Sequence, residues 1–368
     1  MRSIIRKVGG RLVPDAWRRF YRFVESDPSR KDGVPLRIKL SMWRKGFYAN
    51  RYCYYGLDEH DSRMYVSDYF NLLCHPYNGQ YSTLIDNKLY LPIYLQRFSG
   101  HVPEYYYLLT SGKAVRLFGD RAVLAKDSRE FQDGLVDIIK KRRCVAKPMD
   151  KEGGQGVLVL QAEQDGFLIN NRLCRRDDLL AFMLRQDGYV VCEFVNQHSY
   201  ATALNPTTTN TVRLLTCWDR QTGSPFVAAS FHRIGRPHMF GADNGALGGL
   251  IASIDLDSGS LGHIAHREHG PVRYIEEHPD SGVRVYGTTL PHFDRITATV
   301  MKMCSELNFI SYIAWDIVIT EDSFKVLELN SLTDMYGYQL FGPLLSDKRL
   351  LEFYQSYVTP RNSRYFMR

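Results

Sequence analysis

The segment SYIAWDIVITEDSFKVLELNSLTD, residues 311–334, decides the fold because it combines two apolar, strand-like runs with acidic residues. The runs flank the short polar turn EDS, a pattern that predicts an antiparallel hairpin. With the turn centred on Asp322, Asp316 lies opposite Glu328. Alternate side chains of a strand share one face, so Asn330 joins them. The segment therefore predicts an all-oxygen cluster on an otherwise apolar sheet.

The same register pairs Thr320 with Phe324 and Val318 with Val326. It depends on the length of the turn, because a slip by one residue moves every side chain of a strand to the other face. An even number of residues in the turn would therefore separate the two carboxylates.

Two carboxylates that face each other repel, and burial raises the free-energy cost of charging both. A hard divalent cation removes that repulsion, because Mg²⁺ binds oxygen ligands, often one or two carboxylates together with substrate phosphates. Asp316, Glu328 and Asn330 are therefore the predicted ligands of Mg²⁺ or Mn²⁺. The alternative is that Asp316 and Glu328 form separate ion pairs with lysines or arginines.

A second segment, VAKPMDKEGGQGVLVL at residues 145–160, places Lys147 inside an apolar run and glycines after it. A cation on a buried strand predicts an anionic partner. Gly153, Gly154 and Gly156 would let backbone N–H groups approach an anion closely, although a hairpin turn has the same composition. The segment is not a P-loop, because in GxxxxGK[ST] the lysine follows the glycines.

Length, charge and cysteine content limit the class of protein. A chain of 368 residues is long enough for two or three lobes. The net charge of +7 suits anionic partners such as nucleotides, phosphorylated sugars or an anionic membrane surface, and we expect no nucleic-acid partner. The seven cysteines are scattered without CxxC pairs, which predicts reduced thiols. No apolar run approaches the ~20 residues of a membrane span, so we expect a cytoplasmic protein.

The N-terminal residues 1–31 carry nine lysines and arginines against three acidic residues, with aromatic residues between them. One interpretation is an amphipathic helix that contacts anionic lipid, which would hold the protein weakly at the inner face of the membrane. The other is a helix that packs Trp17, Phe20 and Tyr21 against the rest of the protein while its arginines stay solvated. We expect the packed helix, and the lipid contact stays open.

The pattern of apolar runs predicts an α+β protein in four parts. These are a basic and aromatic region at 1–80, a linking helix and strand at 81–114, a small α+β lid lobe at 115–195, and a larger C-terminal α+β lobe at 196–368. The predicted metal site lies in the last part. Within the link, apolar residues at helical spacing predict a helix over residues 87–98, with Asp86 as its N-cap.

The chain resembles the ATP-grasp superfamily of carboxylate–amine ligases in the order and spacing of six segments: DNKLYLPIYLQRF…VPEYYYL, VAKPMDKEGGQGV, CEFV, NTVRLLT, FHRIGR and AWDIV…KVLELN. These segments span roughly residues 80–335. More narrowly, LNPTTTNTVRLLT and ADNGALGGLIASIDLDSGSLG resemble the sugar-transfer-associated ATP-grasp group, whose members are associated with bacterial surface-polysaccharide synthesis. The resemblance implies an ATP-grasp fold, in which ATP with Mg²⁺ lies between a small lid lobe and a larger C-terminal lobe.

The resemblance also implies roles for individual residues. They are contacts to phosphate for Lys88 and Lys147, a flexible loop over the phosphates for Gly153, Gly154 and Gly156, contacts to adenine for Glu193 and Val195, and stabilisation of an acyl phosphate or γ-phosphate for Arg213 and Arg233. Residue chemistry leaves alternatives, because Lys88 could be a solvated helix residue and the arginines could pair with the hairpin carboxylates. Asn244, in the glycine-rich segment 240–250, is a further candidate near the acceptor.

The implied reaction is ATP-dependent formation of an amide from a small-molecule carboxylate and an amine through an acyl phosphate. The expected substrates are an amino acid or amine and a sugar or polysaccharide precursor, and it stays open whether a nucleotide or a lipid carries the sugar. One alternative is a phosphotransferase that acts on a sugar or another small molecule. Another is a nucleotide-binding component of polysaccharide assembly without turnover.

Overall fold

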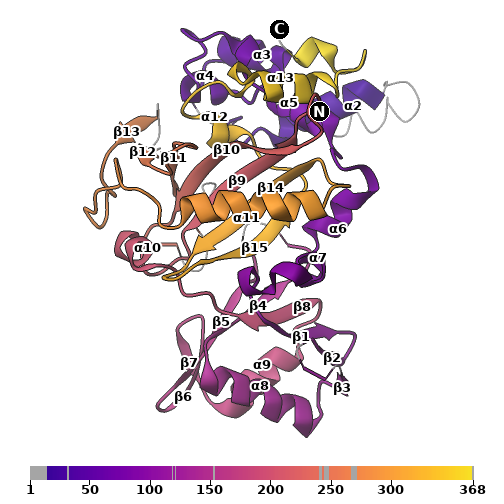
Figure 1. The fold of residues 1–368 in the computed structure, drawn as a ribbon, viewed down its shortest axis with the longest axis vertical. Coiled ribbons are helices and arrows are strands. Elements are labelled where there is room, and N and C mark those ends of the chain that lie inside the picture. Colours follow the sequence, from indigo (N-terminus) through magenta and orange to yellow (C-terminus); the bar gives the residue numbers. More distant parts are fainter. Residues whose placement is uncertain are drawn as a thin grey trace. The chain divides into compact units, whose positions relative to one another are not determined.

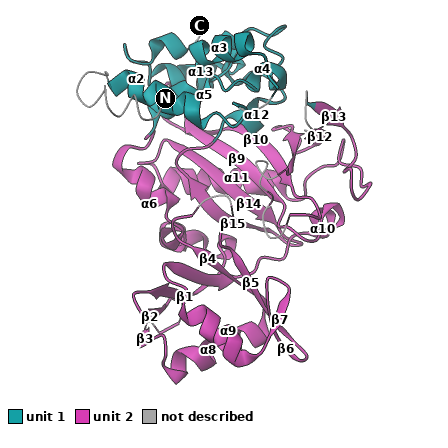
Figure 2. Ribbon diagram, turned by 180° about the vertical axis from the view of Figure 1, so that it is seen from behind, with its two compact units in different colours: residues 1–75, 268–272, 334–368 teal, residues 76–267, 273–333 magenta. Residues whose placement is uncertain are grey.

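The computed structural model describes residues 15–30, 33–117, 119–120, 122–151, 154–239, 243, 248–266 and 272–366. Figure 1 labels the helices and strands of these residues. The chain forms two compact units, which Figure 2 shows in different colours. Unit 1 combines residues 1–75, 268–272 and 334–368, and unit 2 combines residues 76–267 and 273–333.

Unit 1 is built from short helices that come from both ends of the chain. They are α2 (Asp15–Ser26), α3 (Leu36–Lys45), α4 (Arg51–Tyr54), η1 (Ser62–Met64), α5 (Asp68–Cys74), α12 (Tyr336–Gln339), η6 (Leu344–Ser346), α13 (Lys348–Gln355) and η7 (Ser363–Tyr365). Aromatic rings from the two ends pack together, as Phe70 does against Tyr354 and Phe366. The high aromatic content of the first 80 residues therefore serves a core that the C-terminal helices complete.

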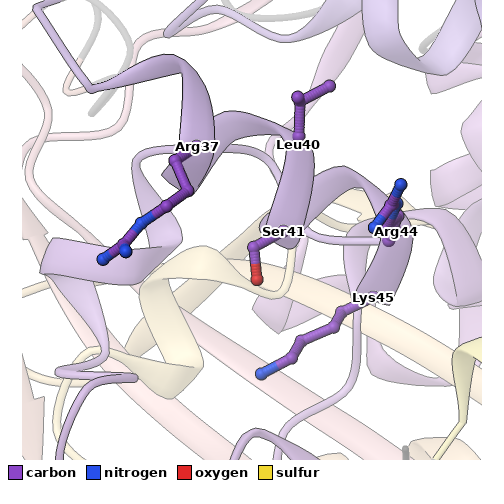
Figure 3. A pocket seen from close by; sticks show the side chains of 5 residues that line it. All are labelled: Arg37, Leu40, Ser41, Arg44 and Lys45. Carbon is purple, nitrogen blue, oxygen red and sulfur yellow. The ribbon is translucent and has the colours of Figure 1, made fainter.

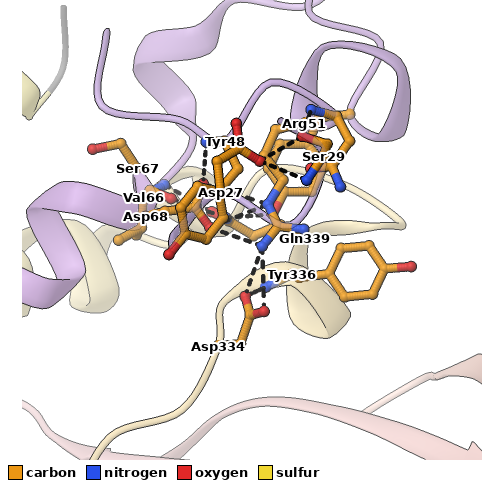
Figure 4. A network of polar contacts seen from close by, with 12 residues as sticks. Asp27, Ser29, Tyr48, Arg51, Val66, Ser67, Asp68, Asp334, Tyr336 and Gln339 are labelled. Carbon is orange, nitrogen blue, oxygen red and sulfur yellow. Dashed lines mark hydrogen bonds and ion pairs between the residues drawn. The ribbon is translucent and has the colours of Figure 1, made fainter. Parts of the chain in front are cut away.

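A buried arginine links the N-terminal and C-terminal segments of unit 1. Arg51 is 3% exposed, and its guanidinium lies 2.8 Å from Asp68 and 3.1 Å from Asp334 (Figure 4). Its guanidinium carbon lies 4.8 Å from the centre of the Tyr336 ring, and Asp68 also accepts a hydrogen bond from the backbone N–H of Tyr48. A buried charge is stable only when it is paired, so this network fixes the helices of unit 1 relative to one another.

Helix α2 presents two of its aromatic residues to solvent. Phe23 is buried, and Phe20 packs edge-on against Tyr69 with ring centroids 5.5 Å apart. Trp17 is 66% exposed and Tyr21 is also exposed, so the prediction that both pack inward is wrong. The reason is helical spacing, because Phe23 is the residue that faces the core, and at 3.6 residues per turn Trp17 and Tyr21 lie about 120° and 160° around the helix from it. Across the described helices, α2 included, none is long and apolar enough to span a membrane.

Unit 2 contains two antiparallel sheets. Among the described residues, the first sheet has eight strands in the order β3-β2-β1-β8-β4-β5-β6-β7. They are β1 (Tyr105–Thr110), β2 (Lys113–Arg116), β3 (Val123–Ala125), β4 (Cys144–Pro148), β5 (Leu158–Glu163), β6 (Gly166–Ile169), β7 (Arg172–Cys174) and β8 (Tyr189–Glu193). Helices α8 (Arg129–Lys141) and α9 (Arg176–Leu184) pack on this sheet (Figure 1) and share its core through Phe131, Leu135 and Met183.

The second sheet has seven described strands in the order β13-β12-β11-β10-β9-β14-β15. They are β9 (Thr211–Trp218), β10 (Pro225–Ile234), β11 (Leu250–Ile254), β12 (Leu261–His266), β13 (Arg273–Ile275), β14 (Tyr312–Ile319) and β15 (Phe324–Asn330). Helix α11 (Phe293–Glu306) lies across this sheet (Figure 1) and buries Ile296 and Val300, and α10 (Ser199–Leu204) precedes β9. Every residue of β14 is buried, which explains why that strand is apolar apart from Asp316.

Within unit 2, the segment that precedes the first sheet is a chain of short helical pieces. They are η2 (Gly79–Tyr81), α6 (Ser82–Asp86), η3 (Lys88–Tyr90), α7 (Leu91–Tyr94) and η4 (Gln96–His101). The prediction of one helix over residues 87–98 is therefore wrong. Pro92 lies in the first turn of α7, where a backbone N–H has no partner within the helix and its absence costs nothing. In the interior of a longer helix the same residue would remove a hydrogen bond and break the helix.

The predicted N-cap of that helix also differs in the structure. Asn87, not Asp86, caps η3 by accepting a hydrogen bond from a backbone N–H. Asp86 instead accepts two hydrogen bonds of 2.7 Å from the backbone N–H and hydroxyl of Ser331. This contact fixes the link against the chain directly after β15, so the neighbouring Lys88 is held close to the hairpin.

Candidate functional site

The hairpin of β14 and β15 does not have the predicted register next to its turn. Phe324 lies opposite Ile319 and not Thr320, and residues 317–319 all pair one position away from the prediction. The connection holds four residues, 320–323, an even number. In a regular hairpin this shift would have turned the two carboxylates to opposite faces.

A β-bulge restores the predicted pairing further along the hairpin. The register shifts between Ile317 and Asp316, so Asp316 lies opposite Glu328 after all. Leu327 is the extra residue on β15, and a bulged residue is left out of the ladder of hydrogen bonds. The Nζ of Lys147 donates to the carbonyl of Leu327 at 3.2 Å. The bulge therefore both aligns the carboxylates and gives Lys147, on β4 of the other sheet, a fixed place beside them.

Two arginines from neighbouring strands hold Asp316. Arg213 of β9 pairs with Asp316 in the register of β9 and β14, and its Nη2 donates to Oδ2 at 3.0 Å. Arg233 of β10 reaches the same Oδ2 at 3.0 Å. The Nε of Arg233 also lies 3.3 Å from Asp243 Oδ1 and donates to the hydroxyl of Thr211 at 2.9 Å. Both guanidinium groups are therefore fixed in position, by Asp316 of β14 and, for Arg233, also by Asp243.

The charges of this group are set by burial and by its ion pairs. Burial has the largest effect on the pKa of Asp316 and raises it, and the charge of Glu328 raises it as well. Arg213 and Arg233 lower it, and the resulting pKa is about 6. Asp316 is therefore ionised at neutral pH. Burial lowers the pKa of Arg233, but the attraction of Asp243 and Asp316 raises it further, to above the ordinary value for arginine.

Lys88 connects Glu328 to the start of the glycine loop. Its Nζ lies 3.3 Å from Glu328 Oε2 and donates to the backbone carbonyl of Lys151 at 2.8 Å. The side chain of Lys88 is largely shielded from solvent. Burial raises the pKa of Glu328, but Lys88, Arg213 and Lys147 lower it, and the result is a pKa of about 2. Glu328 therefore remains charged at every pH at which the protein is expected to work.

The described glycines of the loop after β4 adopt backbone conformations that favour glycine. Gly154 and Gly156 both have φ of +76°. A Cβ at Gly156 would lie 3.0 Å from the hydroxyl of Tyr189, so a larger residue would displace that side chain. Gly153 lies outside the described residues.

The two residues predicted to contact adenine lie where β8 ends. Glu193 Oε2 accepts a hydrogen bond of 3.0 Å from the backbone N–H of Glu104, and Lys325 Nζ lies 3.6 Å from the same oxygen. Val195 is buried two residues further on. The segment after β8 is thus held against the second sheet through Lys325 of β15.

Positive charge exceeds negative charge at the centre of this site. Four cations meet three carboxylates there, namely Lys88, Lys147, Arg213 and Arg233 with Asp243, Asp316 and Glu328. The sequence left open whether the hairpin carboxylates pair with basic side chains, and the structure shows that they do. An excess of fixed positive charge in a partly buried site favours a polyanionic ligand. The individual roles in phosphate, adenine and metal binding stay predictions.

The oxygen atoms of the hairpin also fit a hard divalent cation. Glu328 is 24% exposed, so its carboxylate can be reached. Asn330 donates its amide N–H to the carbonyl of Ala314 at 3.4 Å, which leaves its own carbonyl oxygen as a possible ligand atom. Within the described ranges no group of three or more His, Cys, Asp or Glu residues could hold a metal ion. A cation bound here would therefore also use amide and ligand oxygens, as Mg²⁺ with phosphates does.

Sequence reasoning did not single out Asp243 or Thr211. Asp243 accepts hydrogen bonds from the backbone N–H and the hydroxyl of Thr211, at 2.8 and 2.5 Å, and thereby braces Arg233. The available signal was an acidic residue inside the glycine-rich segment 240–250. The candidate named there, Asn244, lies outside the described residues.

The profile of the family described as "Sugar-transfer associated ATP-grasp" matches residues 70–349. No curated protein sequence matches the chain.

Several solved structures are similar to the chain at low sequence identity. An N5-carboxyaminoimidazole ribonucleotide synthetase in complex with ADP has 11% identity and a TM-score of 0.40 over 70% of this chain and 47% of its own. Biotin carboxylase from Campylobacter jejuni has 12% identity and a TM-score of 0.41 over 77% and 48%. D-alanyl-alanine synthetase A from Vibrio cholerae has 11% identity and a TM-score of 0.42 over 74% and 65%. The chain spans about half of the length of the first two.

Proposed function

The chain belongs to the sugar-transfer-associated ATP-grasp family and has the ATP-grasp fold, and from this we propose that it is an ATP-dependent carboxylate–amine ligase. The observation that carries the proposal is the facing pair Asp316 and Glu328, surrounded by the cations of β4, β9, β10 and η3. A site of this charge suits a nucleotide triphosphate and an acyl phosphate formed beside it.

We propose that ATP binds between the two sheets of unit 2. Lys88 and Lys147 would contact its phosphates, since both ammonium groups lie beside the hairpin. The two lysines share one nearby carboxylate, that of Glu328, so neither is neutralised by a carboxylate of its own. The loop with Gly153, Gly154 and Gly156 would cover the phosphates through backbone N–H groups. Glu193 and Val195, at the end of β8, would contact the adenine.

Asp316, Glu328 and Asn330 are the proposed ligands of Mg²⁺, or of Mn²⁺ in its place. When bound, the metal would neutralise phosphate charge and orient the triphosphate. In its absence Lys88 and the arginines neutralise the same carboxylates. We therefore propose that Lys88 moves from Glu328 towards phosphate when the metal nucleotide binds.

The proposed chemistry has two steps. An oxygen of the substrate carboxylate attacks the γ-phosphorus of ATP, the bond to the bridging oxygen breaks, and ADP leaves with an acyl phosphate formed. The nitrogen of an amine then attacks the acyl carbon, phosphate leaves, and the amine loses a proton to give the amide. Arg213 and Arg233 would stabilise the negative charge that develops on the acyl phosphate, because their guanidinium groups are already fixed by Asp316 and Asp243. This catalysis consists of positioning and charge neutralisation.

The substrates and the location of the protein are proposals that rest on the family. We propose that the protein joins an amino acid or amine to a sugar or polysaccharide precursor, carried by a nucleotide or a lipid, in a bacterial cytoplasm. The basic residues 1–31 are a proposed weak contact with the inner face of the membrane, and Trp17 and Tyr21 of α2 supply exposed aromatic side chains for it.

One assay distinguishes this reaction from phosphotransfer. The protein is incubated with Mg-ATP and pooled carboxylates and amines, including amino sugars and uronic acids, while ADP and free phosphate are measured. A ligase releases both products only when an acid and an amine are present. ADP together with a phosphorylated product and no free phosphate would replace the ligase by a kinase. The absence of ATP turnover with every pool would support a binding component without catalysis.

A further inference from the structure

Helix α3 in unit 1 presents large apolar side chains to solvent. Leu36 is 67% exposed and Leu40 is 47% exposed. The two residues are four apart and lie on one side of the helix. Two neighbouring exposed leucines form a small apolar patch, and a patch that polar residues surround is typical of a contact site.

Basic side chains surround these leucines. Arg37, Ser41, Arg44 and Lys45 line, together with Leu40, a surface hollow of about 410 Å³ (Figure 3). No acidic residue lines it. The residues have the spacing of one helical stripe, so they leave the same side of α3. The hollow therefore combines three cations, one hydroxyl and an apolar side chain.

The cations of the hollow are available to a ligand. Among the residues that the structure describes, none forms an ion pair or hydrogen bond with the guanidinium of Arg37 or Arg44. The hydrogen bonds with Arg63, 2.6 Å away, lower the pKa of Asp61 most, and the charge of Lys45 lowers it less, so Arg63 and not Lys45 is the ion-pair partner of that carboxylate. The local charge is thus positive and not neutralised within this part of the chain.

Helix α3 is fixed in unit 1 by residues outside this stripe. Met42 is buried, and Trp43, at the edge of the exposed face next to Leu36, donates its indole N–H to Asp27 Oδ2 at 2.7 Å. The helix ends at Gly46, which has φ of +85° and donates its N–H to the last turn. A Cβ at Gly46 would lie 2.9 Å from the hydroxyl oxygen of Ser67, so the end of the helix packs closely. The outward stripe is therefore held in place before any ligand arrives.

We propose that the outward face of α3 docks on an anionic phospholipid surface, with a headgroup phosphate in the hollow of Arg37, Arg44 and Lys45. Leu36 and Leu40 would enter the boundary between headgroups and acyl chains, while the long basic side chains extend to the phosphates. Cations attract an anionic leaflet, and apolar side chains gain from leaving water, so the two contributions act together. This contact lies outside the basic segment 1–31 and does not depend on the proposed ligase reaction.

The test measures partition of the full chain onto vesicles of phosphatidylcholine with and without phosphatidylglycerol, by sedimentation. The double variant Arg37→Gln/Arg44→Gln should bind about 25-fold more weakly to the anionic vesicles, since each cation near such a surface contributes about fivefold. The matched control is Lys140→Gln/Lys141→Gln, which removes the same charge from two exposed lysines at the end of α8 in unit 2. The control should change binding less than about twofold.

A second variant tests the apolar part. Leu36→Ser/Leu40→Ser should weaken binding at high salt as well as at low salt, because apolar burial is not screened. Unchanged thermal unfolding of both α3 variants shows that a loss of binding does not come from unfolding, as expected for exposed positions. Equal losses in the α3 and α8 charge variants would overturn the proposal, because only net charge would then matter. Full binding by the α3 variants, or equal binding of the wild type to neutral vesicles, would overturn it as well.

Discussion

Replacing Glu328 by glutamine should weaken the folded protein as well as stop catalysis. The pKa of Glu328 is lowered to about 2 from its ordinary value of 4.5, because Lys88, Arg213 and Lys147 together outweigh the effect of burial. A lowered carboxylate pKa stabilises the fold above pH 4.5, and that stability is lost as the pH falls through about 2. The shift corresponds to about 3 kcal/mol. Since the side chain is 24% exposed, this value is an upper bound.

The measurement is urea unfolding at pH 7, in which Glu328→Gln should lower the free energy of unfolding by up to about 3 kcal/mol. The matched control is Glu306→Gln. Glu306 pairs with Arg97 at 3.3 Å on the surface of the same unit, where both side chains are exposed. An exposed pair contributes little, so the control should change stability by about 0.5 kcal/mol or less.

In the absence of urea, the same variant tests the proposed metal site by its activity. Glu328→Gln should reduce Mg-ATP turnover on the order of 100-fold, a typical effect of losing one charge contact at the transition state. If Glu328→Gln unfolds like Glu306→Gln, the pairing with Lys88 does not stabilise the fold and the reasoning from charge is refuted. If turnover stays within tenfold of the wild type, Glu328 does not belong to the reaction.

Three further predictions test the fold and the site. Burial lowers the pKa of His232, whose Nδ1 lies 3.0 Å from the Thr211 carbonyl, so stability should fall as the pH drops below 6.5. His232→Gln should reduce that slope by up to about 1.4 kcal/mol per pH unit in urea unfolding, and an unchanged slope would contradict the assignment. Arg51→Met should cost about 3–5 kcal/mol because it leaves Asp68 buried without its partner. Adding Asp68→Leu should recover part of this loss in the same assay, and a further loss would refute the account. Lys147→Met should weaken ATP binding about tenfold or more in calorimetry without Mg²⁺, whereas unchanged affinity would remove Lys147 from the nucleotide site.

Local sequence patterns predicted the two strands of the hairpin, β14 and β15, because burial on a sheet leaves a direct trace in composition. Strand β14 is buried along its whole length and is therefore apolar except at Asp316. Helix α11 and strands β9 and β10 also follow apolar runs that could be read directly. The prediction of one helix over residues 87–98 is wrong because it rests on the spacing of apolar residues and ignores the break that Pro92 imposes.

The sequence by itself determined which chemistry is available. It supplied two carboxylates and an amide on a hairpin, lysines and arginines on strands, and the order of segments by which the family could be identified. It also identified Asp316 and Glu328 as a facing pair, although by a register that is wrong next to the turn.

Only the tertiary structure decided how these groups meet. The bulge at Leu327 shows only in the pairing of the whole hairpin, and its carbonyl accepts a hydrogen bond from Lys147, 180 residues away in sequence. The contacts of Arg213 and Arg233 with Asp316 depend on the order of strands in the sheet, which local composition does not encode. Ion pairs form between residues that are close in space and far apart in the sequence. The charged residues of the site could therefore be identified from the sequence, but their ion-pair partners could not.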